Sequence, residues 1–323
     1  MPRIGTVIRD VYRRPGAEEL PRHLERRYGI RVAATTKLDA GVFKVERHGG
    51  PAWVARLSVL GRPLARTEGH AEVLRFLERR EFPAERCAGP EPVSSLDGRT
   101  VLVTEYIDGR PWPGTPATRR KLGEMLGRLH ALPTEPGPTE RPAGALHHLP
   151  EYEGYPSQDL AAAAALLADL EGRVPPEHRR TYESLQALLA RGDDGSGLPE
   201  SFLHPDPVRS NVLAAPGGPV LIDWTGAGRG PRIASLAVLL TNMGPQHLEE
   251  VLAGYHAHLN LTVEELDRLE GVLWIRHLWL ACWQCWLAVV SSKVNKGFVP
   301  DPVRVAAVAS KARAVSTELQ GNA

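Results

Sequence analysis

The chain has 323 residues, which favours two lobes or domains over one small core. It carries 39 basic and 38 acidic residues, for a formal net charge of +1. This balance gives no indication of a nucleic-acid or anionic-membrane partner, because such proteins usually have a strong basic excess. An odd, low number of cysteines (three) argues against a disulfide framework, and the charged start of the chain is unlike a secretory signal. We therefore expect a cytoplasmic protein.

Short strands and one helix are predicted between residues 28 and 107. β-rich runs at 30–34, 42–47 and 53–57 are separated by turns that contain glycine. Apolar residues at helical spacing predict a helix over 71–79, and TVLVTEYI at 100–107 predicts a strong strand. The Gly- and Pro-containing segment DGRPWPGTP then follows, and we interpret it as the link between two lobes.

Helices are predicted over most of the remaining chain. The longest apolar run, 272–290, is interrupted by Arg276, and an arginine at the centre of a membrane span is costly. We therefore expect a buried helix there and no membrane partner. The predicted helices cover 118–132, 158–170, 178–191, 233–241, 247–259, 262–291 and 301–318.

The segment FLHPDPVRSNVLAAPGGPVLIDWTGAGRG contains the chemically informative residues. Its pattern is H-x-D-x-x-x-x-N, from His204 through Asp206 to Asn211, and Asp223 follows between a hydrophobic and an aromatic residue. Each of the three polar residues alone is typical of a turn or cap, but their joint spacing matches the catalytic loop and metal-binding aspartate of protein kinases. We interpret His204 as structural.

Phosphoryl transfer explains why these residue types occur together. A carboxylate can orient an acceptor hydroxyl and take its proton, and Asp206 fits this role. The phosphates of the nucleotide require Mg²⁺, which prefers oxygen ligands, and Asn211 and Asp223 offer an amide and a carboxylate oxygen. The runs NVLAA and PVLID, joined by PGG, predict a hairpin that carries both metal ligands.

The chain resembles the aminoglycoside phosphotransferase (kinase-like) superfamily, which includes choline, homoserine and macrolide kinases. The resemblance covers residues 28–292 and is most specific in HPDPVRSN and LIDWTGAGRG, with support from WVARL, LRFLERREFPAERC, VLVTEYIDG and LGRLHALP. It implies an α+β, bilobal, protein-kinase-like fold. The implied division is a small β-rich nucleotide-binding lobe over 1–107 and a large helical lobe over 108–323 with the catalytic loop and substrate site.

The resemblance also implies a nucleotide site for ATP or GTP with Mg²⁺. The family's phosphate-binding cation on the third strand maps onto Arg56, which can contact phosphate oxygens. The phosphate-covering turn maps onto LDAGVF, where Gly41 allows close approach of the backbone. The adenine-binding hinge maps onto Thr104, Glu105 and Ile107, together with Tyr106.

Three positions depart from the family pattern. The usual His-Gly-Asp is His-Pro-Asp, with Pro205 in the middle. Ser235 stands where the family has an aspartate that anchors the catalytic loop, so the anchor is expected to be weaker. Counting places His70 where the acid that pairs with Arg56 should lie, and that partner stays unassigned.

The acceptor is a small hydroxylated metabolite or antibiotic in the leading hypothesis. A Ser or Thr of a peptide is a second hypothesis, and a kinase-like binding partner without turnover is a third, motivated by Ser235. Among the acids near the expected substrate region are Glu151, Glu153 and Asp159, but they form no dense cluster suited to a polycationic aminoglycoside. Cys282 and Cys285 indicate buried packing. The last long helices carry four tryptophans, which indicate either core packing or an aromatic pocket wall: Trp274, Trp279, Trp283 and Trp286.

Overall fold

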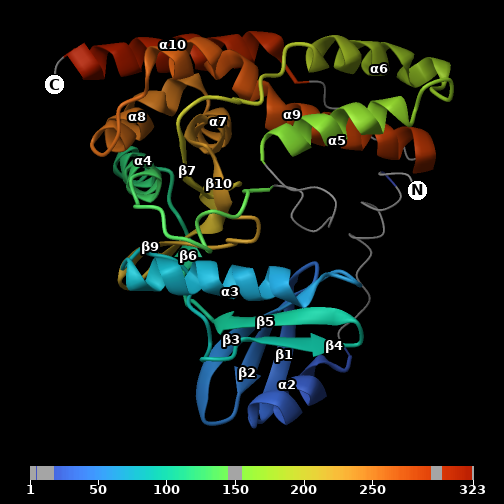
Figure 1. The fold of residues 1–323 in the computed structure, drawn as a ribbon, viewed down its shortest axis with the longest axis vertical. Coiled ribbons are helices and arrows are strands. Elements are labelled where there is room, and N and C mark those ends of the chain that lie inside the picture. The colour runs from blue at the N-terminus through green and yellow to red at the C-terminus, as the bar shows by residue number, and fades with distance from the viewer. Residues whose placement is uncertain (1–4, 6–17, 145–154, 292–299, 322–323) are drawn as a thin grey trace.

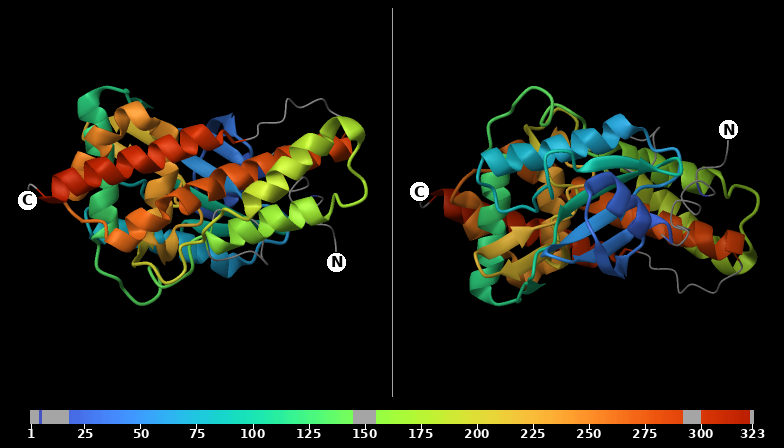
Figure 2. Two further views of the ribbon diagram at one scale, coloured as in Figure 1. Left: turned by 90° about the horizontal axis from the view of Figure 1, so that it is seen from above. Right: turned by 90° about the horizontal axis from the view of Figure 1, so that it is seen from below.

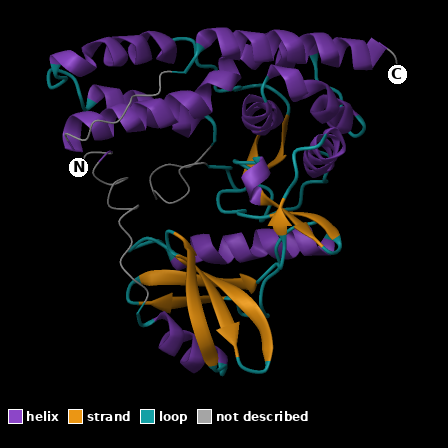
Figure 3. Ribbon diagram, turned by 180° about the vertical axis from the view of Figure 1, so that it is seen from behind, coloured by secondary structure: helices purple, strands orange, loops and turns teal. Residues whose placement is uncertain are grey.

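The computed structural model describes residue 5 and residues 18–144, 155–291 and 300–321. The described chain forms a β-rich lobe and a larger helical lobe, which lie at the bottom and top of Figure 1. Figure 3 shows the same division from behind, with most strands gathered at one end and helices at the other. The bilobal α+β architecture predicted from the sequence is confirmed.

An antiparallel five-stranded sheet forms the body of the smaller lobe, with strand order β1-β2-β3-β5-β4. Trp53, Ala55 and Leu57 of β3 face its core, whereas Arg56 lies between them and faces the other way, because successive side chains of a strand alternate. The elements of this lobe are α2 (Leu20–Tyr28), β1 (Val32–Asp39), β2 (Val42–Arg47), β3 (Gly50–Leu57), α3 (Leu64–Arg79), β4 (Val93–Leu96) and β5 (Arg99–Glu105).

Helix α3 connects the two lobes. It lies between the sheet and the helical lobe in Figure 1 and in Figure 3. Phe76 of α3 packs edge-to-face on Phe202 of the other lobe, at 5.5 Å between ring centroids, and Phe82 packs on Trp224 at 5.6 Å. These rings belong to the largest hydrophobic core, so the lobes share buried surface beside the link.

Some elements of the small lobe were not predicted, and others were predicted to be shorter than they are. Helix α2 and strand β4 were not predicted, and α3 begins at Leu64 rather than at 71. Strand β1 reaches Asp39, where a turn was expected. Seven of the eight β1 residues are exposed, so this strand has no alternating apolar pattern from which to recognise it.

Two small sheets and a set of helices build the larger lobe. The predicted hairpin exists: β8 pairs antiparallel with β9, and Val212 lies opposite Leu221. The strands are β6 (Arg110–Pro111), β7 (Glu200–Leu203), β8 (Val212–Ala215), β9 (Gly218–Leu221) and β10 (Gly228–Pro231). The helices are α4 (Pro116–His130), α5 (Ser157–Ala168), α6 (Pro176–Leu189), α7 (Arg232–Met243), α8 (Leu248–His256), α9 (Val263–Ser291) and α10 (Pro302–Gly321), with short 3₁₀ turns at Arg209–Asn211 and Pro245–His247.

Helix α9 is the central element of this lobe. It packs against α5, α6, α7 and α10, and Figure 2 shows α5, α6 and α9 side by side. By length and composition alone α9 could cross a membrane, but 61% of its most apolar stretch is buried inside the protein, in agreement with the predicted buried helix. Cys282 and Cys285 are free thiols in the α5–α9 core, as predicted for packing residues.

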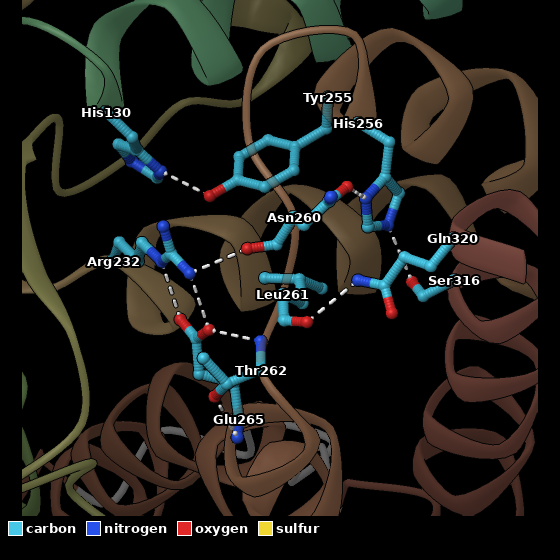
Figure 4. Close-up of polar contacts among 10 residues, drawn as sticks. All are labelled: His130, Arg232, Tyr255, His256, Asn260, Leu261, Thr262, Glu265, Ser316 and Gln320. Carbon is cyan, nitrogen blue, oxygen red and sulfur yellow. Dashed lines mark hydrogen bonds and ion pairs between the residues drawn. The ribbon is translucent and has the colours of Figure 1, made fainter. Parts of the chain in front are cut away.

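A buried polar network fixes the start of α9 (Figure 4). Arg232 of α7 donates two hydrogen bonds of 2.8 Å to the fully buried carboxylate of Glu265. Thr262 and Glu265 cap the helix reciprocally: each backbone N–H donates to the other side chain. Nearby, His130 of α4 contacts the hydroxyl of Tyr255 at 2.9 Å, and burial lowers the pKa of His130 to about 3.

Candidate active site

The predicted catalytic loop, residues 204–211, begins where β7 ends, and His204 fixes its shape. The imidazole is fully buried and packs edge-to-face on Trp224, with ring centroids 4.8 Å apart. Its Nε2–H donates to the carbonyl of Ile222 at 3.1 Å, and its Nδ1 accepts from the backbone N–H of Asp206 at 3.2 Å. Burial lowers the pKa of His204, which favours this neutral form. His204 therefore holds the catalytic loop beside the strand that leads to Asp223, the structural role predicted for it.

Ser235 anchors the same loop from α7. Its buried hydroxyl donates a 2.7 Å hydrogen bond to the backbone carbonyl of His204. A serine at this position was expected to anchor the loop less strongly than the family's aspartate. The hydrogen bond nevertheless has an ordinary length and is fully buried. Ser235 therefore still anchors the backbone of the loop at His204.

Asn211 closes the loop over Asp206. Its Nδ2 donates to the carbonyl of Asp206 at 2.9 Å and to its Oδ2 at 3.3 Å. This orientation directs the amide hydrogens to Asp206 and leaves Oδ1 as the atom suited to a cation. The side chains of Asp206 and Asn211 both line the cleft between the lobes.

Asp223 follows β9 in a left-handed backbone conformation, with φ of 66°. A non-glycine residue rarely adopts this conformation, and its strain is typical of functional sites. Its N–H donates to Glu85 Oε1 at 3.0 Å, while the N–H of Ile222 donates to the carbonyl of Asn211 at 2.8 Å. The backbone thereby brings Asn211 and Asp223 to the same part of the cleft. An amide oxygen and a carboxylate, completed by nucleotide phosphates, fit the oxygen preference of Mg²⁺.

Glu85 is the partner of Arg56 that counting along the sequence did not find. The Arg56 Nη1 lies 2.7 Å from Glu85 Oε2, and the Glu85 side chain is 3% exposed. Thr104 joins this pair, because its hydroxyl accepts from Arg56 at 3.1 Å. His70, at the position reached by counting, lines the cleft instead.

Glu85 belongs to the segment FPAERC, between α3 and β4. This segment bonds to both lobes: the carbonyl of Pro83 accepts from Leu221, and the carbonyl of Arg86 accepts from Glu105. An acid in an otherwise mostly apolar segment is the sequence signal that could have directed attention to it.

The cleft between the lobes has a volume of about 660 Å³. Arg56, Asp206, Asn211 and Asp223, predicted from widely separated parts of the sequence, all line it. Its apolar walls come from both lobes: Leu38, Val42, Val54, Leu102, Ile107, Leu213 and Ile222.

Only some of the residues predicted for the hinge and the phosphate-covering turn line the cleft. Glu105 and Ile107 line the cleft, but Thr104 is not among its lining residues, because its buried hydroxyl bonds to Arg56 and Glu85. Gly41 has φ of 71° in the turn between β1 and β2. Its neighbours Ala40 and Val42, rather than Gly41 itself, are among the lining residues.

A family model for the phosphotransferase enzyme family matches residues 37–272. The chain belongs to this family. No curated protein matches the sequence as a relative.

Solved structures share the fold at low sequence identity. The amicoumacin kinase hAmiN, in complex with AMP-PNP, Ca²⁺ and Ami, matches with a TM-score of 0.59 at 14% identity over 97% of this chain and 96% of that one. The choline kinase LicA from Streptococcus pneumoniae matches with a TM-score of 0.59 at 15% identity over 92% and 99%. An aminoglycoside-3'-phosphotransferase of type VIII matches with a TM-score of 0.54 at 23% identity over 80% and 97%. The protein-kinase-like fold predicted from the sequence is thereby confirmed.

In this member of the phosphotransferase family, α9 forms the end of the cleft beyond Asp206. Arg276, Trp279, Leu280 and Trp283 line it there. Both interpretations of the tryptophans are partly right: Trp274 and Trp286 are buried in the core, Trp279 is buried in the core and also lines the cleft, and Trp283 lines the cleft. Of the three acids considered for an acceptor site, Glu151 and Glu153 lie outside the described residues and Asp159 is fully buried.

Proposed function

We propose that the protein is an ATP-dependent phosphotransferase that moves the γ-phosphoryl group to a hydroxyl of a small metabolite or antibiotic. The convergence of Asp206, Asn211 and Asp223 with the Arg56–Glu85 pair in one cleft carries this proposal. A base, two oxygen ligands and a fixed cation are the parts that phosphoryl transfer requires, since its catalysis consists of positioning and charge stabilisation.

Each residue has one task in this proposal. Asp206 orients the acceptor hydroxyl and receives its proton as the bond to phosphorus forms. Asn211 and Asp223 would hold Mg²⁺, which neutralises phosphate charge when bound. Arg56, oriented by Glu85, contacts nucleotide phosphate oxygens under the turn at Gly41, and the backbone at Glu105 and Ile107 faces the base.

The proposal also includes the roles of the two lobes, the location of the protein and the kind of acceptor. We assign nucleotide binding to residues 1–107, the catalytic loop and acceptor site to 108–323, and the cytoplasm as location. Similar structures include enzymes whose names specify small acceptors, such as choline and spectinomycin, which supports a small-molecule acceptor over a peptide. The bond from Ser235 to His204 holds the loop, which supports an active enzyme over a partner without turnover.

Thermal unfolding with Mg·ATP and with Mg·GTP tests the nucleotide site directly. A ligand that binds only the folded state raises the melting temperature. We expect a shift in the wild type, loss of the Mg²⁺-dependent part of that shift in Asp223→Ala, and retention of the shift in Asp206→Ala, because Asp206 acts on the acceptor. Equal shifts in Asp223→Ala and wild type would remove Asp223 from the metal site. A wild type with no shift for either nucleotide would contradict the proposed function.

A further inference from the structure

Arg276 stands on the acceptor side of the cleft, in contact with the proposed base. Its Nη2 lies 3.3 Å from Asp206 Oδ1, and 27% of its side chain is exposed. An acceptor hydroxyl must approach the Asp206 carboxylate to within about 2.6–3.2 Å. The Arg276 guanidinium is therefore within reach of any phosphoryl group that joins that hydroxyl oxygen.

The position of Arg276 in an apolar helix makes the contact informative. Helix α9 is apolar enough to resemble a membrane span and is largely buried. A charge in such surroundings is costly unless it is paired. Arg276 forms an ion pair with Asp206. The unfavourable burial of this charge in α9 is therefore offset at the proposed reaction centre.

Asp159 of α5 is a second, buried acid that interacts electrostatically with Arg276. Helices α5 and α9 pack together, and Trp286 Nε1 donates to Asp169 Oδ2 at 2.7 Å across a separation of 117 residues. Asp159 and Arg276 have the same separation along the same two helices. Asp159 is fully buried, and neither of its carboxylate oxygens has a hydrogen-bond partner within the described chain. Burial raises the pKa of Asp159, and the positive charge of Arg276 opposes this shift.

Two of the arginines that line the cleft, Arg56 and Arg276, come from opposite lobes. Arg56 reaches in from β3 and is fixed by Glu85. Arg276 reaches in from α9, pairs with Asp206 and interacts electrostatically with the buried Asp159. In phosphoryl transfer the charge is spread over three equatorial oxygens, so a second cation on the acceptor side stabilises the transition state without taking part in bond making.

Building on the proposed function, we propose that Arg276 is a further catalytic residue, which contacts the transferred phosphoryl group, and that Asp159 is its positioning residue. In the step itself, the acceptor oxygen bonds to the γ-phosphorus and its proton passes to Asp206. The bond from phosphorus to the β,γ-bridging oxygen breaks, and its electron pair leaves with ADP. Arg276 keeps its protons throughout and supplies charge.

Aluminium fluoride tests this role without knowledge of the acceptor. Bound with Mg·ADP, it mimics the phosphoryl group in transfer, so the gain in Mg·ADP affinity on its addition reports contacts made to that group. We expect this gain, measured by isothermal titration calorimetry, to fall at least about tenfold in Arg276→Met. Mg·ADP affinity without fluoride should stay within about twofold of wild type, and Arg276→Lys should recover part of the gain, because it keeps the charge.

Arg268→Met is the matched control. Arg268 lies on the same helix, is 28% exposed and pairs with Asp193 at 2.7 Å, away from the cleft. It should retain the wild-type gain. Asp159→Asn should reduce the gain several-fold while the protein stays at least as stable at pH 8, because a buried amide costs less than a buried carboxylate.

The outcomes separate this inference from the proposed function. Wild type that fails to bind Mg·ADP would contradict the proposed function. Wild type that binds Mg·ADP but shows no gain with fluoride, or Arg276→Met that keeps the full gain, would overturn the role of Arg276. An unchanged gain in Asp159→Asn would remove Asp159 as its positioning residue.

Discussion

Glu85 couples the two halves of the candidate site through its two carboxylate oxygens. One oxygen pairs with Arg56 at 2.7 Å, and the other accepts from the backbone N–H of Asp223 at 3.0 Å. The residue that orients the phosphate-binding cation thus also holds the strained backbone of a proposed metal ligand. Nucleotide affinity and metal affinity should therefore change together when Glu85 changes.

Glu85→Gln is expected to weaken Mg·ATP binding by about tenfold or more, because an amide cannot neutralise Arg56, and breaking a buried pair is strongly unfavourable. Calorimetric titration with Mg·ATP, and with ATP in EDTA, measures both effects. Glu91→Gln serves as a control, since Glu91 pairs with Arg27 at 2.6 Å on the exposed surface of the same lobe. Identical Mg·ATP affinity in Glu85→Gln and wild type would show that the pair has no part in nucleotide binding.

Residue identity and spacing were sufficient to predict that Asp206, Asn211 and Asp223 lie together, but not to find the partner of Arg56. Asp206, Asn211 and Asp223 lie on one loop and hairpin, so their separation in sequence limits their separation in space. Glu85 reaches Arg56 through tertiary packing, from a segment with no helical or strand period. Arg276 was visible in the sequence as a charge in an apolar run, but only the structure shows that it faces Asp206.

At the scale of elements, the position of α9 decides where Arg276 and the tryptophans point. The network in Figure 4 fixes the first turn of this helix to α7 through Arg232 and Glu265. The sequence TVEE at its start is a capping box, so the beginning of α9 was predictable to within one residue. By contrast, β1 was predicted too short, because its exposed residues lack any alternation.

Glu265→Ala should destabilise the protein by about 3–5 kcal/mol, since it leaves the largely buried Arg232 without its counter-charge. Urea unfolding provides the free energy. Glu264→Ala is a suitable comparison, because Glu264 is 66% exposed and pairs with Arg268 on the surface; its effect should stay within about 1 kcal/mol. Equal effects of the two substitutions would mean that the network does not stabilise α9.

At the scale of the whole molecule, the lobes are joined by a shared core as well as by the link. Phe76, Phe82, Phe202 and Trp224 form ring contacts across the boundary. We expect the described parts of both lobes to unfold together, because this core would be exposed if either lobe unfolded alone. A substitution in one lobe should thus be detected in a single global transition.

The pH dependence of that transition should report the buried carboxylate of Asp159. Burial raises its pKa from an ordinary value of 3.8 to about 7; the nearby Arg276 opposes this shift, and Asp206 adds to it. Tyr155, also buried, is a further titratable group near Asp159. Between these two pH values the unfolded chain releases the proton while the folded protein keeps it. The free energy of unfolding therefore falls as pH rises from about 4 to 7, and then levels off.

Asp159→Asn should remove this part of the slope. At about 1.4 kcal/mol per unit of pKa shift, the variant should gain on the order of 4 kcal/mol relative to wild type between pH 4 and pH 8. Urea unfolding of both proteins across this range measures the difference, and using the difference cancels the titration of all other groups that the substitution leaves unchanged. A constant difference would mean that Asp159 is ionised at low pH in the folded protein. A rising difference would show that the fold keeps a destabilising carboxylate beside Arg276, as expected if that carboxylate serves phosphoryl transfer rather than stability.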